Sequence, residues 1–95
     1  MFEVHPGAIL KEELEARRMS GNALALALRI NSGRISEILN GKRGISADTA
    51  LRLGRYFGND PQFWLGLQSA HDLAVANRES GERIKQEVLP AQSAA

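Results

Sequence analysis

The stretch RISEILNGKRG, residues 34–44, places a helix-like apolar pattern directly before two cations that stand between glycines. Its apolar residues are spaced to line one face of a helix: Ile35, Ile38 and Leu39. The cations Lys42 and Arg43 follow Asn40-Gly41, a pair that favours a helix end with positive φ. Such a turn can bind a nucleotide phosphate or track a nucleic-acid backbone, and the rest of the chain has to separate these two possibilities.

A nucleotide-binding P-loop does not fit this turn. A P-loop lies between a strand and a helix, and its Lys is followed by a Ser or Thr that helps to hold magnesium. Here Lys42 follows a predicted helix, and Arg43 stands where the hydroxyl would be needed. The pattern therefore favours contact of Lys42 and Arg43 with nucleic-acid phosphates, where both cations displace counterions.

Length and composition indicate one small globular protein. The chain has 95 residues, of which 43% are hydrophobic, and contains no apolar run long enough to span a membrane. It contains no cysteine, so it has neither a disulfide nor a thiolate metal site, and its first residues do not resemble a secretory signal. We therefore expect a cytoplasmic protein with no membrane association.

The net charge of +1 conceals an uneven distribution along the chain. Residues 17–55 contain eight cations against Glu37 and Asp48, a net charge of +6, whereas the two flanks together carry −5. A basic segment between acidic flanks is typical of a protein that presents one face to a polyanion. On charge alone, chance clustering on a solvated surface stays open as the alternative.

Caps and apolar spacing predict an all-α fold of five short helices with a C-terminal extension. The helices are predicted at about residues 6–17, from a cap at Ser20 or Asn22 through Leu28, at 32–39, from a cap at Ser46 to Gly58, and at 61–77. Residues 23–28, ALALAL, alternate like a strand, but Ala and Leu favour helix and no β-branched residue occurs there. We expect a DNA-binding domain over residues 1–77 and a helix or flexible tail over residues 78–95.

The second and third predicted helices meet the packing requirements of a helix-turn-helix motif. Such a motif needs a small residue where the helices cross, a tight turn, and a buried stripe on the second helix. Ala25 supplies the small residue and Ile30 anchors the turn. Arg29 occupies the turn position usually filled by glycine, so either it takes a positive φ, at about 1 kcal/mol, or the turn has a different shape.

Four phrases of the sequence resemble a known family: HPGAILKEEL, NALALAL, RISEILNGKRGISADTALRLGRYFG and DPQFWLGLQSAHDL. Over residues 5 to about 75 the chain is similar to the HigA (VapI-like) antitoxins of bacterial type II toxin–antitoxin modules, which are lambda-repressor-like helix-turn-helix proteins. The resemblance implies a homodimer that binds a palindromic double-stranded DNA operator, neutralises a RelE-like mRNA-cleaving toxin of HigB type and represses its own operon. A dimeric transcriptional regulator without a toxin partner is the alternative.

The helix at 32–39 is the predicted recognition helix. Residues off its apolar stripe are predicted to read bases: Ser32, Gly33, Arg34, Ser36 and Glu37. We favour a guanine contact for Arg34 over a phosphate contact, whereas Ser32 can instead cap the helix and Glu37 can instead hold Arg34 in place. Predicted phosphate contacts are Ser20, Asn22, Asn40, Lys42 and Arg43.

The remaining conspicuous residues point to packing, not chemistry. Phe63, Trp64 and Leu67 are predicted to lie in the core or a dimer interface, because aromatics without interleaved cations do not form a single-strand groove. Two isolated histidines without cysteines predict no metal site, and no constellation predicts a cofactor or an enzyme. An acidic face on the first helix is a candidate toxin surface, with an ordinary solvated face as the alternative: Glu12, Glu13 and Glu15.

Overall fold

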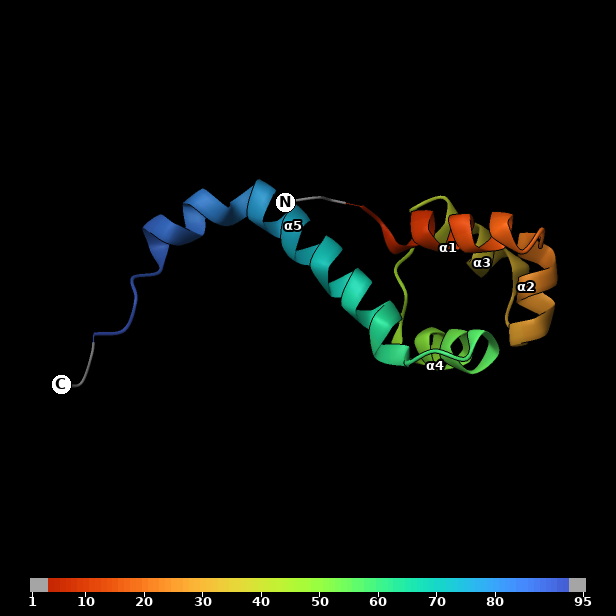
Figure 1. Cartoon of the computed structure of the whole chain (residues 1–95). Coiled ribbons are helices and arrows are strands. Elements are labelled where there is room, and N and C mark those ends of the chain that lie inside the picture. Colours follow the sequence, from red (N-terminus) through yellow and green to blue (C-terminus); the bar gives the residue numbers. More distant parts are fainter. Residues whose placement is uncertain (1–3, 93–95) are drawn as a thin grey trace.

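The computed structural model describes residues 4–92 as five α-helices joined by short loops (Figure 1). The helices are α1 (Pro6–Ala16), α2 (Gly21–Leu28), α3 (Ser32–Leu39), α4 (Ala47–Phe57) and α5 (Pro61–Glu87). Residues 4–92 contain no strand, which confirms the all-α prediction and the helical reading of residues 23–28. Within the same residues, no helix is both long and apolar enough to cross a bilayer.

Most helix starts are fixed by the side chains that the sequence predicts. The caps Ser20 of α2, Ser46 of α4 and Asp60 of α5 each accept a hydrogen bond from a backbone N–H two or three residues later. The cap of α3 is Asn31, whose Oδ1 accepts a hydrogen bond from the Gly33 N–H at 2.7 Å. The prediction that Ser32 can cap this helix is therefore wrong, and Ser32 lies exposed in the first turn.

The core lies where α1 to α4 meet the first turns of α5. Its fully buried side chains include Leu10, Leu24, Ile35, Ile38, Leu53 and Trp64. Burial of each such side chain contributes about 1.5–3 kcal/mol to folding. Gly7 of α1 approaches α3 so closely that an added Cβ would overlap the backbone carbonyl of Ile38. This contact sets α1 across the end of the predicted recognition helix.

Helix α5 is much longer than the sequence predicts, because it runs to Glu87 instead of ending near residue 77. Its first turns pack on α4 and α1, whereas its later turns project from the body of the protein (Figure 1). The helix passes through Gly81, since one interior glycine costs only about 1 kcal/mol relative to alanine. These later turns form the projecting arm of α5. Exposed apolar side chains lie on the arm or directly after its last residue: Leu73, Ile84, Val88 and Leu89. Residues 93–95 of the predicted tail lie outside the described residues.

Candidate nucleic-acid interface

Helices α2 and α3 form the predicted helix-turn-helix. Ala25 is buried, and its carbonyl accepts a hydrogen bond from the Ile30 N–H at 3.0 Å. Arg29 has φ 61° and ψ 42°, which is the left-handed conformation. Of the two alternatives for this position, the chain therefore uses the positive φ and keeps a non-glycine residue there.

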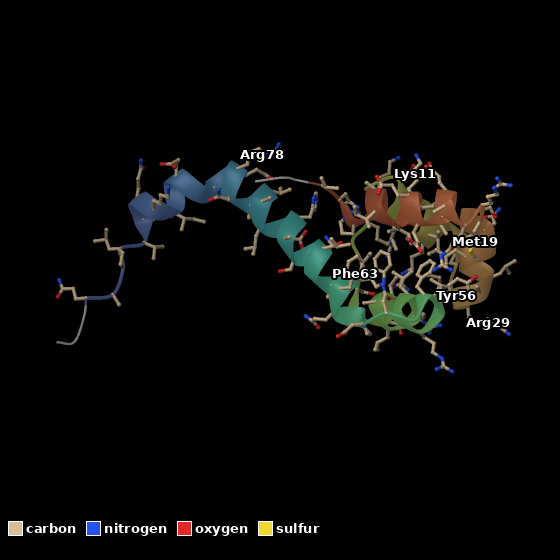
Figure 2. All side chains as sticks on the ribbon, viewed as in Figure 1. Lys11, Met19, Arg29, Tyr56, Phe63 and Arg78 are labelled. Atoms are coloured by element: carbon tan, nitrogen blue, oxygen red, sulfur yellow. The ribbon has the colours of Figure 1, made fainter. Side chains whose placement is uncertain are left out.

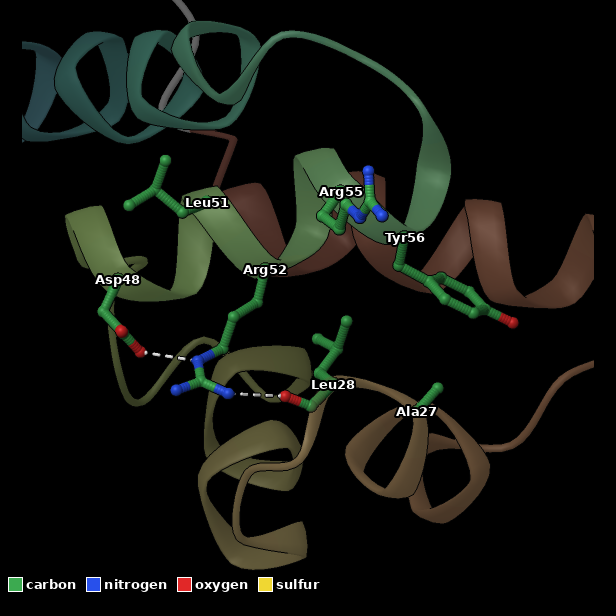
Figure 3. A pocket seen from close by; sticks show the side chains of 7 residues that line it. All are labelled: Ala27, Leu28, Asp48, Leu51, Arg52, Arg55 and Tyr56. Carbon is green, nitrogen blue, oxygen red and sulfur yellow. Dashed lines mark hydrogen bonds and ion pairs between the residues drawn. The ribbon is translucent and has the colours of Figure 1, made fainter.

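Arg52 of α4 anchors the same turn, a contact that the sequence does not predict. Its Nη1 donates a hydrogen bond to the Leu28 carbonyl at 2.8 Å, and its Nε pairs with Asp48 Oδ2 at 2.9 Å (Figure 3). The Leu28 carbonyl is one of the groups left unpaired where α2 ends. The ion pair and the hydrogen bond together tie the end of α2 to α4.

A groove across the first turns of α2 and α3 brings together much of the predicted DNA-binding set. Its lining residues are Lys11, Ser20, Gly21, Asn22, Ser32, Ser36, Leu39 and Asn40. All polar residues in it except Lys11 belong to the predicted base or phosphate contacts. The first turns of helices direct backbone N–H groups and a partial positive charge toward an anion. This polar groove therefore has the chemistry to hold a phosphate backbone.

Lys11 is a component of the polar groove that sequence reasoning missed. Its side chain is exposed on α1 and lines the groove (Figure 2). Its charge reaches the groove because α1 crosses α3 at Gly7. A helical periodicity shows which residues share a face but not which neighbouring helix that face meets, so no local pattern predicts this role of Lys11.

Arg34 does not extend freely from the recognition helix. Its Nη2 donates a hydrogen bond to Ser46 Oγ at 3.0 Å, and Ser46 is the cap of α4. Its Nε is buried without a hydrogen-bond partner. The Arg34 side chain can contact a base only after it leaves Ser46. The base contact of Arg34 therefore stays a prediction. Gly33 lies beside it in the exposed first turn of α3.

The basic loop, residues 41–44, leaves the end of α3 with both cations exposed. Gly41 has φ 73°, which confirms the helix stop with positive φ. The Lys42 N–H donates a hydrogen bond to the Glu37 carbonyl at 2.8 Å. The Glu37 carboxylate pairs with Arg43 at 3.3 Å, so the prediction that it holds Arg34 is wrong. Both partners are about half exposed, and such pairs contribute only about 0–1 kcal/mol.

The large apolar residues at the start of α5 differ in how deeply they are buried. Trp64 is buried, and its Nε1 donates a hydrogen bond to Asn59 Oδ1 at 3.1 Å. Leu67 is partly buried against the core. Phe63 packs edge-on against Trp64 with ring centroids 5.1 Å apart, yet it is 48% exposed. Trp64 and Leu67 are therefore packing residues of the domain, whereas Phe63 is available to a further surface.

The two histidines, distant in sequence, meet in the structure. Their ring centroids lie 4.9 Å apart, and His5 Nδ1 accepts a hydrogen bond from the Gly7 N–H at 2.9 Å, which caps α1. Burial, and then the charge of His71, lower the pKa of His5 below its usual 6.5, while Asp72 and the backbone of Arg43 oppose this change. Among residues 4–92, no three histidine or carboxylate side chains gather as metal ligands.

Comparison with known proteins places this geometry in a family. The helix-turn-helix family model matches residues 10–64. Virulence-associated protein I of Dichelobacter nodosus is 53% identical over 80 residues, which cover 83% of this chain and 74% of that protein. The structure of an addiction module antidote protein of the HigA family from Coxiella burnetii aligns with a TM-score of 0.93 and 51% identity, covering 96% of this chain and 100% of that chain. The chain belongs to the HigA antitoxin family.

A further HigA structure was solved together with promoter DNA. The Pseudomonas aeruginosa antitoxin HigA, solved with the higBA promoter, has a TM-score of 0.92 and 43% identity, covering 96% of this chain and 100% of that chain. The resemblance to HigA antitoxins that the four sequence phrases indicate is thus confirmed. As a HigA-family member, the chain is a DNA-binding helix-turn-helix regulator of the antitoxin type.

Proposed function

We propose that this HigA-family protein binds a palindromic operator in its own promoter as a homodimer, represses that operon, and neutralises a RelE-like, mRNA-cleaving toxin of HigB type in the cytoplasm. The polar groove carries the proposal, because it joins the starts of α2 and α3 to Lys11 on one exposed face. The relative solved with the higBA promoter supports DNA as the ligand of this face.

In the proposed complex α3 enters the major groove, and the first turn of α2 lies against the backbone. The base-reading set consists of Ser32, Gly33, Arg34, Ser36 and Glu37. The phosphate set consists of Ser20, Asn22, Asn40, Lys42 and Arg43, with Lys11 added from the structure. We assign this work to a domain of residues 1–77 and treat residues 78–95 as its extension. The proposed binding requires no cofactor.

A second copy of the chain is the proposed partner of the projecting arm of α5. Leu73 is 65% exposed and Ile84 is 47% exposed, and both line an apolar groove on this arm. A helix without a packed face is only marginally stable in water, so the arm gains stability when a partner covers it. A single short recognition helix also reads too few base pairs for useful specificity, and a two-fold pair doubles the readout.

The acidic outer face of α1 is the proposed contact for a basic toxin. Glu12 and Glu15 are exposed on this face, whereas Glu13 is engaged in an ion pair with Arg17 at 2.7 Å. Opposite charge across an interface raises the association rate and disfavours wrong partners. Glu12 and Glu15 are therefore better placed than Glu13 to meet toxin cations.

Co-expression with the product of the adjacent small reading frame tests the proposal. The expected result is rescue of growth, co-elution of both proteins in size-exclusion chromatography, and a gel shift of the promoter by the complex. Promoter binding without any toxin partner would instead establish the alternative, a dimeric transcriptional regulator. Absence of salt-sensitive, sequence-selective promoter binding would refute both functions.

A further inference from the structure

The far end of the basic loop is attached to α5 through Gln68. Gln68 Oε1 accepts a hydrogen bond from the Ile45 N–H at 2.8 Å, and Gln68 Nε2 donates one to Asp72 Oδ1 at 2.9 Å. The same side chain fills the space beside Gly44, where an added Cβ would lie 2.9 Å from Gln68 Cδ. Gln68 thus holds the backbone at the point where the loop turns into the core at the buried Ile45.

The near end of the loop rests on His5. The His5 ring lies beside Gly41, 3.8 Å from the position that a Cβ would take there. The His5 Nδ1 accepts a hydrogen bond from the Gly7 N–H at 2.9 Å. Burial lowers the pKa of the His5 ring, and the backbone of Arg43 opposes this change. His71 of α5 supports the ring from its edge.

A loop bounded by two glycines has many conformations available, and ordering it on DNA would cost entropy. The side chains that hold this loop come from its inner side, whereas Lys42 and Arg43 remain exposed on the outer side. Fixing a loop in its bound conformation before the ligand arrives raises affinity by removing that entropic cost.

We propose that Gln68, supported by Asp72 and assisted by His5, is a positioning residue for DNA binding. It holds the basic loop so that Lys42 and Arg43 meet the phosphates, without touching DNA itself. This proposal rests on the proposed DNA-binding function. It gives the segment containing Gln68 and Asp72, residues 68–72 of α5, a role in affinity that is separate from packing of the core.

The test replaces Gln68 by Met in the full-length chain, which removes both hydrogen bonds and keeps the length of the side chain. Binding to a fluorescent promoter duplex is measured by anisotropy at several salt concentrations. We expect affinity to fall about tenfold and the slope of log affinity against log salt to flatten by about one to two units, because two cations lose their fixed position. Gln62→Met, on the exposed first turn of the same helix, is the matched control and should leave both quantities unchanged.

Two further measurements separate positioning from a general loss of structure. In Gln68→Met, amide hydrogen exchange at Ile45 should accelerate while amides of α3 stay as protected as in the parent protein. Combining Gln68→Met with Lys42→Ala should flatten the salt slope less than the sum of the two single changes, because both act on the same phosphate contact.

The proposal is overturned if Gln68→Met keeps the parental salt slope, or binds like Gln62→Met. A parent protein that shows no salt-sensitive promoter binding would overturn the proposed function instead. If Gln68→Met does not fold, Asp72→Ala replaces it, since this change removes only the outer support of Gln68. Asp72→Ala should then flatten the slope by a smaller amount, and an unchanged slope counts against the proposal.

Discussion

Replacing Arg29 by Gly should stabilise the protein, although it removes an entire side chain. Arg29 has φ 61° and its side chain is exposed, so little packing is lost. The left-handed conformation costs a non-glycine residue about 1–2 kcal/mol. Glycine also has greater freedom in the unfolded chain, which reduces the gain in stability by about 0.5–1 kcal/mol. The expected net gain is about 0.75 kcal/mol, which raises Tm by about 3–6 °C in a domain of this size.

Thermal unfolding followed by circular dichroism measures this effect, with Arg55→Gly as the matched control. Arg55 is also exposed, but it lies within α4, where glycine costs about 1 kcal/mol. Both variants lose one positive charge, so a general charge effect would move their Tm values together. A Tm for Arg29→Gly that equals or falls below the parental value would refute the strain assigned to this turn.

Three further predictions concern packing, pH and DNA. Gly7→Ala should lower the free energy of unfolding by about 1–3 kcal/mol, because the new Cβ meets a carbonyl of α3; an unchanged denaturant midpoint would contradict this. Because burial lowers the pKa of His5 below 6.5, the unfolded chain takes up the proton first, and the free energy of unfolding should fall as the pH drops below 6.5. Urea titrations over this range should show a weaker fall for His5→Asn. Arg34→Ala should weaken operator binding by about 1–3 kcal/mol with little effect on binding to random DNA. Lys42→Ala should weaken binding to both DNAs and flatten the salt slope by about one unit. Equal losses of affinity for Arg34→Ala on both DNAs would exclude base reading.

The helices could be predicted because their starts and ends are written in short-range signals. The cap of α4 and the Asp60-Pro61 start of α5 each act on backbone groups within three residues. The predicted and observed bounds of α3 agree at Ser32–Leu39, although its cap is Asn31 and not Ser32. The end of α5 was predicted wrongly because Gly81 is a weak breaker inside a helix that continues on both sides.

The candidate site could be predicted as a set of residues but not as a set of contacts. The bond from Arg34 to Ser46 joins residues twelve apart, and that from Ile45 to Gln68 joins residues twenty-three apart. Such pairs depend on the angles at which helices cross, which follow from packing of the whole core and not from local periodicity. For the same reason Lys11 was not recognised as part of the polar groove.

The unbroken course of α5 also sets a length scale. Its 27 residues correspond to about 40 Å of rise along the helix, slightly more than the roughly 34 Å of one turn of B-DNA. Each residue inserted into the arm would shift its tip by about 1.5 Å and rotate it by about 100°. In the dimer that we propose, the number of residues in this arm would therefore set both the distance between the two recognition helices and their rotation relative to each other. Operators with altered half-site spacing would then be matched by arms of altered length.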